Sequence, residues 1–167
     1  RHPALAKMDM VTVNLSAQSL NDDRFLEFLV SRAQDEDVPS NRVCFQITET
    51  GLITSPDRAR YFITTLQNVG CRFSLDDYGF GFSSFSLLKS LNVDFMRISE
   101  DYVRNIEFSS VDFEIVVSLV RVARTMGRKT IASGVSTEAA CVTLQRIGVD
   151  FVQGPLIDKP RPLQMVR

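Results

Sequence analysis

Residues 59–77 read ARYFITTLQNVGCRFSLDD, and this stretch decides the fold class. Its first eleven residues carry apolar side chains three and four positions apart, which predicts an amphipathic helix over 59–69. Gly70 stands where such a helix ends, and the short apolar run that follows predicts a strand over 72–77. The strand closes on Asp76 and Asp77. Because side chains alternate along a strand, two adjacent carboxylates share one site only where the strand ends.

The same pairing of helix and strand recurs along the chain. Ser55 before Pro56 predicts an N-cap followed by a first-turn proline, and Gly127 and Gly148 stand, like Gly70, where a helix ends. Short connections between alternating elements predict a parallel sheet covered by helices, within a single domain over 1–167. The predicted strands are 11–16, 43–49, 72–77, 95–99, 130–135 and 151–154; the predicted helices are 23–33, 59–69, 84–91, 113–126 and 138–147.

The positions of polar residues distinguish between the two α/β architectures that six strands allow. A (β/α) barrel assembles its site from several strands at their carboxyl face. An open doubly wound sheet uses one switch point and usually carries a glycine-rich first turn, which this chain lacks. We therefore predict a TIM-like barrel, incomplete at about six strand-helix units because 167 residues fall short of the roughly 200 to 250 of a whole one. The polar residues in or near the end of a different predicted strand are Asn14, Gln46, Asp76, Arg97, Ser133 and Gln153.

Composition excludes several functional classes. A net charge of −1 provides no basic field for a nucleic-acid polymer, and no apolar run approaches the roughly 20 residues of a membrane span. The three cysteines form no CxxC pair, so neither a disulfide framework nor a zinc site is indicated, and we expect a reducing, cytoplasmic setting. The chain has a single histidine, His2, and the sequence therefore argues against catalysis by a histidine triad.

Six motifs in a fixed order resemble those of the EAL domains, which are cyclic-di-GMP phosphodiesterases of bacterial signalling and their inactive relatives. The resemblance covers nearly the whole chain. The motifs are Val13-Asn14-Leu15-Ser16, Gln46-Ile47-Thr48-Glu49-Thr50, Leu75-Asp76-Asp77-Tyr78-Gly79, Val93-Asp94-Phe95-Met96-Arg97-Ile98, Ala132-Ser133-Gly134-Val135-Ser136-Thr137 and Gln153-Gly154.

The resemblance implies a modified TIM barrel whose Glu-Ala-Leu strand lies well before the Asn-Leu-Ser strand. Only 13 residues precede Asn14, so we expect the front strands to be missing and the chain to be the C-terminal portion of the barrel. In active members the resemblance further implies two Mg or Mn ions, held in part by an Asn and an Asp pair. These positions correspond here to Asn14, Asp76 and Asp77, which we interpret as vestigial metal ligands.

The departures from the family pattern predict a degenerate catalytic site. Two dications about 3.5 to 4 Å apart need several carboxylates to offset their repulsion, and two aspartates are too few. We therefore expect no bound cofactor and no turnover. The degenerate positions are Gln46 for a glutamate, Ser133 and Ser136 for the two glutamates of Ala-Glu-Gly-Val-Glu, and Arg97 and Ser99 for the lysine and aspartate of Lys-Ile-Asp.

Two functions stay open at this point. The first is an inactive regulatory module in cyclic-di-GMP signalling, either a nucleotide receptor of weak or absent affinity or a protein-interaction platform that self-associates or binds a protein partner. The alternative is an active metal-dependent phosphodiesterase producing the linear dinucleotide. Simpler roles also exist, since Asp76 and Asp77 can cap the following loop and Arg97 can pair with either of them. The ligand-binding candidates are Asn14, Asp76, Asp77, Arg97 and Gln153.

Overall fold

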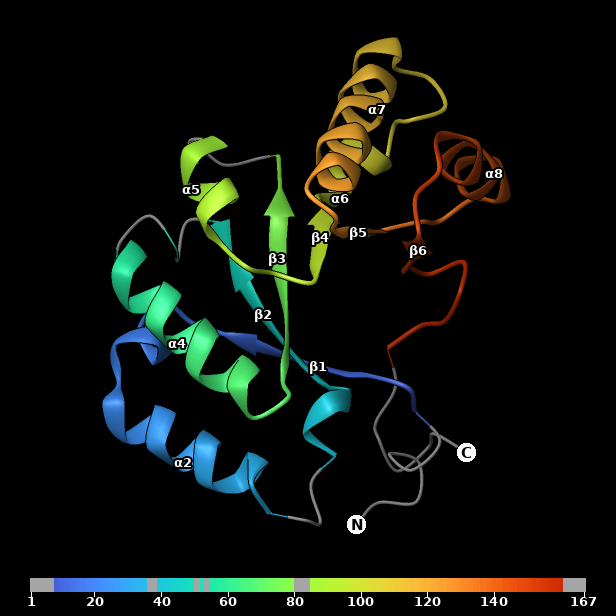
Figure 1. The fold of residues 1–167 in the computed structure, drawn as a ribbon. Helices are drawn as coiled ribbons and strands as arrows, with labels where there is room; N and C mark the ends of the chain where they lie inside the picture. Colours follow the sequence, from blue (N-terminus) through green and yellow to red (C-terminus); the bar gives the residue numbers. More distant parts are fainter. Residues whose placement is uncertain (1–7, 36–38, 50–51, 53–54, 80–84, 161–167) are drawn as a thin grey trace. The chain divides into compact units, whose positions relative to one another are not determined.

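The strands form one sheet in sequence order, β1-β2-β3-β4-β5-β6, in the computed structural model, which describes residues 8–35, 39–49, 52, 55–79 and 85–160. The pairs β1–β2, β4–β5 and β5–β6 are parallel, and helices alternate with the strands (Figure 1). The α/β prediction is therefore confirmed. The strands are β1 (Val11–Leu15), β2 (Val43–Thr48), β3 (Arg72–Tyr78), β4 (Phe95–Ile98), β5 (Lys129–Ala132) and β6 (Phe151–Val152).

The helices agree with the predicted positions and add shorter elements. Gly148 is the left-handed C-cap of α8, and Gly70 and Gly127 also have positive φ directly after a helix, as their placement predicted. Ser55 occupies the N-cap of α4, with Pro56 in the first turn, but its side chain makes no capping bond. The helices are α2 (Asp23–Ala33), α4 (Pro56–Asn68), α5 (Phe85–Ser90), α6 (Glu100–Val103), α7 (Ser110–Thr125) and α8 (Glu138–Ile147), with 3-10 turns η1 (Ser19–Asn21) and η2 (Ser40–Arg42).

The chain divides into two compact units. The first comprises the described residues up to Ser74 together with 85–93, and the second comprises Leu75 to Gly79 and Asp94 to Pro160. Strand β3 contributes its first half to one unit and its second half to the other. The assignment of the whole chain to a single domain stays a prediction.

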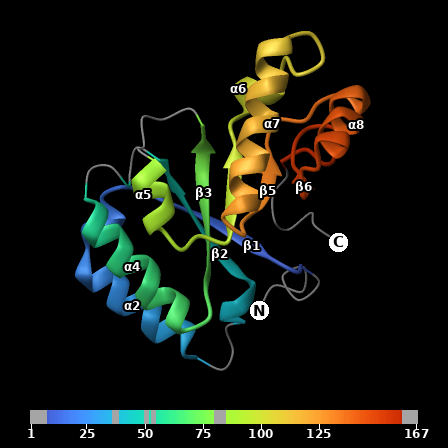
Figure 2. The ribbon, with the colours of Figure 1, turned by 45° about the horizontal axis from the view of Figure 1, so that its top comes forward.

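The first unit is built around the buried face of α4. Phe62, Ile63 and Leu66 are each at most 2% exposed, and their spacing places them on one side of the helix. Phe73 of β3 is fully buried, and its ring centroid lies 5.6 Å from that of Phe45 on β2. Helix α2 runs beside α4 (Figures 1 and 2). These buried side chains belong to the apolar residues from which the helix and the strand of residues 59–77 were predicted.

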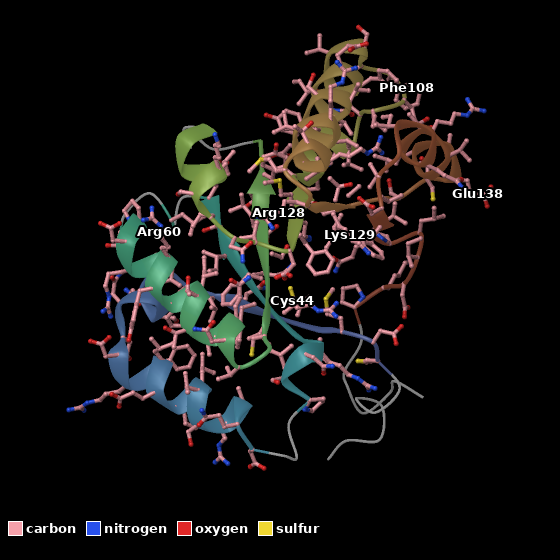
Figure 3. The ribbon with its side chains drawn as sticks, in the orientation of Figure 1. Cys44, Arg60, Phe108, Arg128, Lys129 and Glu138 are labelled. Atoms are coloured by element: carbon pink, nitrogen blue, oxygen red, sulfur yellow. The ribbon has the colours of Figure 1, made fainter. Side chains whose placement is uncertain are left out.

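The second unit has its own core and a polar anchor. Helix α7 buries Val116 and Val120 and contacts both β4 and β5. At the start of β5, the Thr130 N–H and hydroxyl both donate to the Asp150 carboxylate, at 2.8 and 2.9 Å. Beside it, the Lys129 ammonium (labelled in Figure 3) lies 5.5 Å from the ring centroid of Phe151. These contacts hold the loop before β6 against β5.

Several predicted bounds differ from the observed ones, and one helix was not predicted. The helix predicted over 113–126 begins at Ser110, because Ser109 caps it by accepting the Asp112 N–H. Helix α6 was missed, since its four residues are too few to show a helical period. The strand predicted over 130–135 ends at Ala132, because Gly134 adopts a positive φ that a ladder does not allow.

Candidate functional site

Asn14 and Gln46 are neighbours in the first unit. They lie opposite each other in the parallel register of β1 and β2, with Asn14 exposed and Gln46 half-buried. Side chains at paired positions of neighbouring strands point to the same face of a sheet. The structure therefore places these two predicted site residues side by side. Both have amide side chains, and neither is charged.

Asp76 and Arg97 form an ion pair in the second unit. Asp76 lies near the end of β3, and its carboxylate accepts a hydrogen bond from Arg97 Nη1 at 2.5 Å. The Asp76 side chain is only 16% exposed and that of Arg97 23%. Water and salt therefore weaken their attraction less than they weaken that of a surface salt bridge. Asp76 also accepts the Asp77 backbone N–H at 3.0 Å. Both simpler roles considered for these residues thus exist together.

Asp77 has an unusual backbone and a perturbed carboxyl group. Its φ of 55° is the one positive value at a non-glycine position among the described residues, a conformation that Asp tolerates better than most residues. Asp77 is largely exposed, but partial desolvation raises the pKa of its carboxyl, the negative charge of Asp76 raises it further, and the positive charge of Arg97 acts in the opposite direction. The pKa of the Asp77 carboxyl therefore lies above that of an ordinary surface aspartate.

Two of the three serines at positions predicted to be degenerate make hydrogen bonds within the fold. Ser133 is 3% exposed, and its hydroxyl donates to the Ile98 carbonyl at 2.7 Å. Ser99 is 4% exposed and caps α6, its hydroxyl accepting the Asp101 N–H. Ser136 is exposed. In place of carboxylates, two of these three positions carry hydroxyls that are directed to neighbouring backbone groups.

Gln153 is positioned by hydrogen bonds of its backbone, not by the ligand contacts that were predicted for its side chain. Its N–H donates to the Ala132 carbonyl at 2.9 Å, and its carbonyl accepts the Val135 N–H at 3.1 Å. Its side chain is exposed. Gln153 directly follows β6, and these bonds place it beside the residues around Ser133, just after β5.

Sequence reasoning missed the residues of α6. The Tyr102 hydroxyl donates to the Gly79 carbonyl at 2.9 Å and so holds the chain directly after the Asp pair. Glu100 and Asp101 are near enough for their negative charges to raise the pKa of Asp77. A signal existed, because Ser99 followed by acidic residues is a typical helix start. It was assigned instead to a lost catalytic position.

The second unit does not fit a pair of divalent cations. A two-metal site needs several carboxylates facing one place, whereas the Asp76 carboxylate already binds a guanidinium and Ser133 faces a carbonyl. Within the described part of the chain, no three His, Cys, Asp or Glu side chains are grouped as metal ligands. The Asp76 carboxylate is instead paired with one guanidinium, that of Arg97.

The family is decided by comparison with known proteins. A model described as the EAL domain matches residues 2–160. The chain belongs to the EAL domain family. The resemblance inferred from the six motifs is confirmed, and so is the α/β fold, since solved EAL domains superpose on it.

Two solved structures show how similar this EAL domain is to known folds. The PaMucR phosphodiesterase in complex with cyclic-di-GMP has a TM-score of 0.88 at 27% identity, covering 95% of this chain and 64% of that one. The EAL domain of Mycobacterium smegmatis DcpA has a TM-score of 0.86 at 34% identity, covering 93% of this chain and 70% of that one. These likenesses support the barrel-type architecture that the motifs predicted.

Curated relatives of this EAL domain are phosphodiesterases by name. The cyclic di-GMP phosphodiesterase PdeB of Shewanella oneidensis is 37% identical over 92% of this chain and 18% of its own length. The cyclic di-GMP phosphodiesterase PdeF of Escherichia coli is 32% identical over 90% of this chain and 20% of its own length. The chain thus spans about a fifth of these relatives.

Replacing Asp77 by asparagine should stabilise the protein slightly at neutral pH. Asparagine tolerates the same positive φ, so the exchange removes a charge and leaves the backbone preference alone. We expect a gain of about 0.5 kcal/mol, limited by solvent screening. Thermal unfolding of both proteins across pH 3 to 8 measures the difference.

The sign of this effect follows from the raised pKa. The folded state holds the Asp77 proton more tightly than the unfolded state, so its contribution to stability falls as pH rises through the window that begins near the ordinary value of 3.8. The gain of Asp77→Asn should therefore vanish below that window. An equal gain at pH 3 and pH 8 would contradict the electrostatic cause.

Proposed function

We propose that this EAL domain is a catalytically inactive regulatory module in cyclic-di-GMP signalling. The observation that carries the proposal is the ion pair between Asp76 and Arg97, which engages one of the acidic residues on which hydrolysis would depend. The engagement of Ser133 with the Ile98 carbonyl supports it, because a hydroxyl bound in this way offers no charge to a metal. Family membership supplies the signalling context.

A hydrolysis assay tests the proposal directly. Conversion of cyclic-di-GMP to the linear dinucleotide should not exceed background with Mg or Mn, even at high protein concentration. The control is Asp76→Ala, which removes the carboxylate that a residual metal would require. Turnover by the native chain above that control would establish the alternative function, an active phosphodiesterase.

Nucleotide binding without turnover is a separate part of the proposal. The residues that we propose to contact the nucleotide are those predicted from the sequence: Asn14, Asp76, Asp77, Arg97 and Gln153. Because the Arg97 guanidinium is already paired, we propose weak or absent affinity for the phosphates of cyclic-di-GMP. Calorimetry with cyclic-di-GMP, with and without Mg, measures it.

Self-association through α7 is the proposed partner interaction. Ser110, Val111, Glu114, Ile115, Ser118 and Leu119 line a shallow hollow along this helix, and Val111 is 65% exposed. Phe108, just before the helix and labelled in Figure 3, is 88% exposed. Positions 114 and 121 lie on the same side of α7 two turns apart. Two antiparallel copies would therefore place Glu114 of each opposite Arg121 of the other.

A charge-swap series tests this self-association. We expect sedimentation or light scattering to show a dimer that Glu114→Arg weakens by at least about tenfold, because two attractive pairs become repulsive. The double variant Glu114→Arg with Arg121→Glu should restore it. Val142→Arg, at an exposed apolar position of α8, is the matched control and should change nothing. A monomeric native chain would refute the proposal.

The cytoplasmic location is likewise proposed. The three cysteines form no disulfide, as is usual in a reducing compartment. Among the described helices, none combines the length and the apolar character needed to cross a membrane. Labelling of a tagged full-length protein in intact and permeabilised cells tests the location.

A further inference from the structure

The Arg97 side chain is placed to act on one specific carboxylate. It belongs to β4, where it lies opposite Ile131 of β5 in the parallel register, and it is three-quarters buried with Nη1 on Asp76. Its Nε is buried without a hydrogen-bond partner among the described residues. An unsatisfied buried donor costs stability, so the conformation of Arg97 is set by Asp76 rather than by optimal pairing of the whole guanidinium.

The charges around this pair are predominantly negative. Asp77 follows directly, and Glu100 and Asp101 of α6 act electrostatically on it. Glu100 is paired with Arg104 at 2.9 Å, but both of those side chains are more than half exposed. Salt and water screen that exposed pair far more than the buried one. Arg97 is therefore the main positive charge inside this acidic group.

A guanidinium and a divalent cation cannot share one carboxylate oxygen here. A dication would bind Asp76 Oδ1 at close to 2 Å, and Arg97 Nη1 already lies at hydrogen-bond distance from that oxygen. Repulsion between the two cations across a partly buried site is strong, because the local dielectric constant is well below that of water. Arginine does not relieve this by losing its proton.

We infer that Arg97 is the built-in counter-cation of Asp76 and Asp77, and that it excludes divalent metal ions from this pair. The inference rests on the proposed inactive function and gives a physical cause for it at one residue. Arg97 is thus a charge-neutralising residue that keeps the acidic strand end folded without a metal. Removing its charge should expose the Asp76 carboxylate to Mn²⁺ or Mg²⁺.

Binding of Mn²⁺ alone, followed by electron paramagnetic resonance of the free ion at constant ionic strength, tests the inference. Arg97→Gln should gain at least about tenfold in Mn²⁺ affinity over the native chain. Arg97→Lys, which keeps the charge, should gain little. Arg104→Gln removes the same charge from an exposed pair and is the matched control, with no gain expected.

Several outcomes would overturn the inference. One is Mn²⁺ binding by the native chain that Asp76→Ala abolishes; another is an equal gain in Arg97→Gln and Arg104→Gln, or no gain in either. If Arg97→Gln does not fold, as circular dichroism would reveal, Arg97→Met keeps the apolar stem and must show the same gain. The comparison of the native chain with Asp76→Ala decides the matter independently of both.

The test separates this inference from the proposed function. Hydrolysis of cyclic-di-GMP by the native chain would refute the inactive function whatever Mn²⁺ does in the variants. A native chain that hydrolyses nothing, together with an Arg97→Gln variant that gains no Mn²⁺ affinity, would refute the role of Arg97 alone.

Discussion

Replacing Phe73 by alanine is expected to lower the free energy of unfolding by about 4 kcal/mol. Phe73 is fully buried in β3, and its ring packs against Phe45 of β2 at a centroid distance of 5.6 Å. The exchange removes most of a large apolar side chain from a close-packed interior. The cavity left behind adds to the lost burial, since the neighbouring strands cannot collapse around it.

Chemical denaturation of the native chain and the variant measures this loss. The control is Phe28→Ala in α2, within the same unit, because Phe28 is 53% exposed and contacts the Arg32 guanidinium over its ring. Its loss should stay below about 1 kcal/mol. Equal losses at the two positions would mean that Phe73 is not part of a packed core.

The second large effect is expected for Gly154→Ala, which should cost about 3 kcal/mol or more. Gly154 has a φ of 158°, and a Cβ there would overlap the backbone N and O of Val135. Backbone atoms cannot move aside as the end of a long side chain can. The Val135 N–H also donates to the Gln153 carbonyl at 3.1 Å, so relief of the overlap would break that bond.

Gly127→Ala is the matched control for this prediction. Gly127 also has a positive φ, 70°, but no atom lies within 4 Å of the position of its Cβ. Only the conformational cost of about 1 kcal/mol applies there. Denaturation midpoints of the two variants should therefore differ clearly. A Gly154→Ala protein as stable as Gly127→Ala would show that the approach of these two segments is not close.

The regular elements were predictable because local patterns produce them. The helix 23–33 was predicted with the bounds that α2 has, since its apolar residues recur at helical spacing. Gly148 marked the end of α8 because few other residues adopt its left-handed conformation. Helix α6 escaped prediction because four residues cannot display a period.

Much of the candidate site required the three-dimensional structure. The motifs identified Asp76 as a residue that matches the family pattern, and Arg97 and Ser133 as residues that differ from it. A sequence pattern does not say which of these groups bond to one another. Sequence analysis left Arg97 free to pair with Asp76 or Asp77, and the structure selects Asp76. It also shows Ser133 bonded to the Ile98 carbonyl, a contact between residues 35 positions apart that no local pattern encodes.

The sequence by itself determined the order of the longer helices and strands and the family, because each of these depends on residue identity and short-range spacing. Only the tertiary structure decided that Asp76 is paired with Arg97 inside the protein. That result depends on Asp76 of β3 and Arg97 of β4 meeting across a separation of 21 residues. Charge interactions act through distance in space, and folding alone sets that distance.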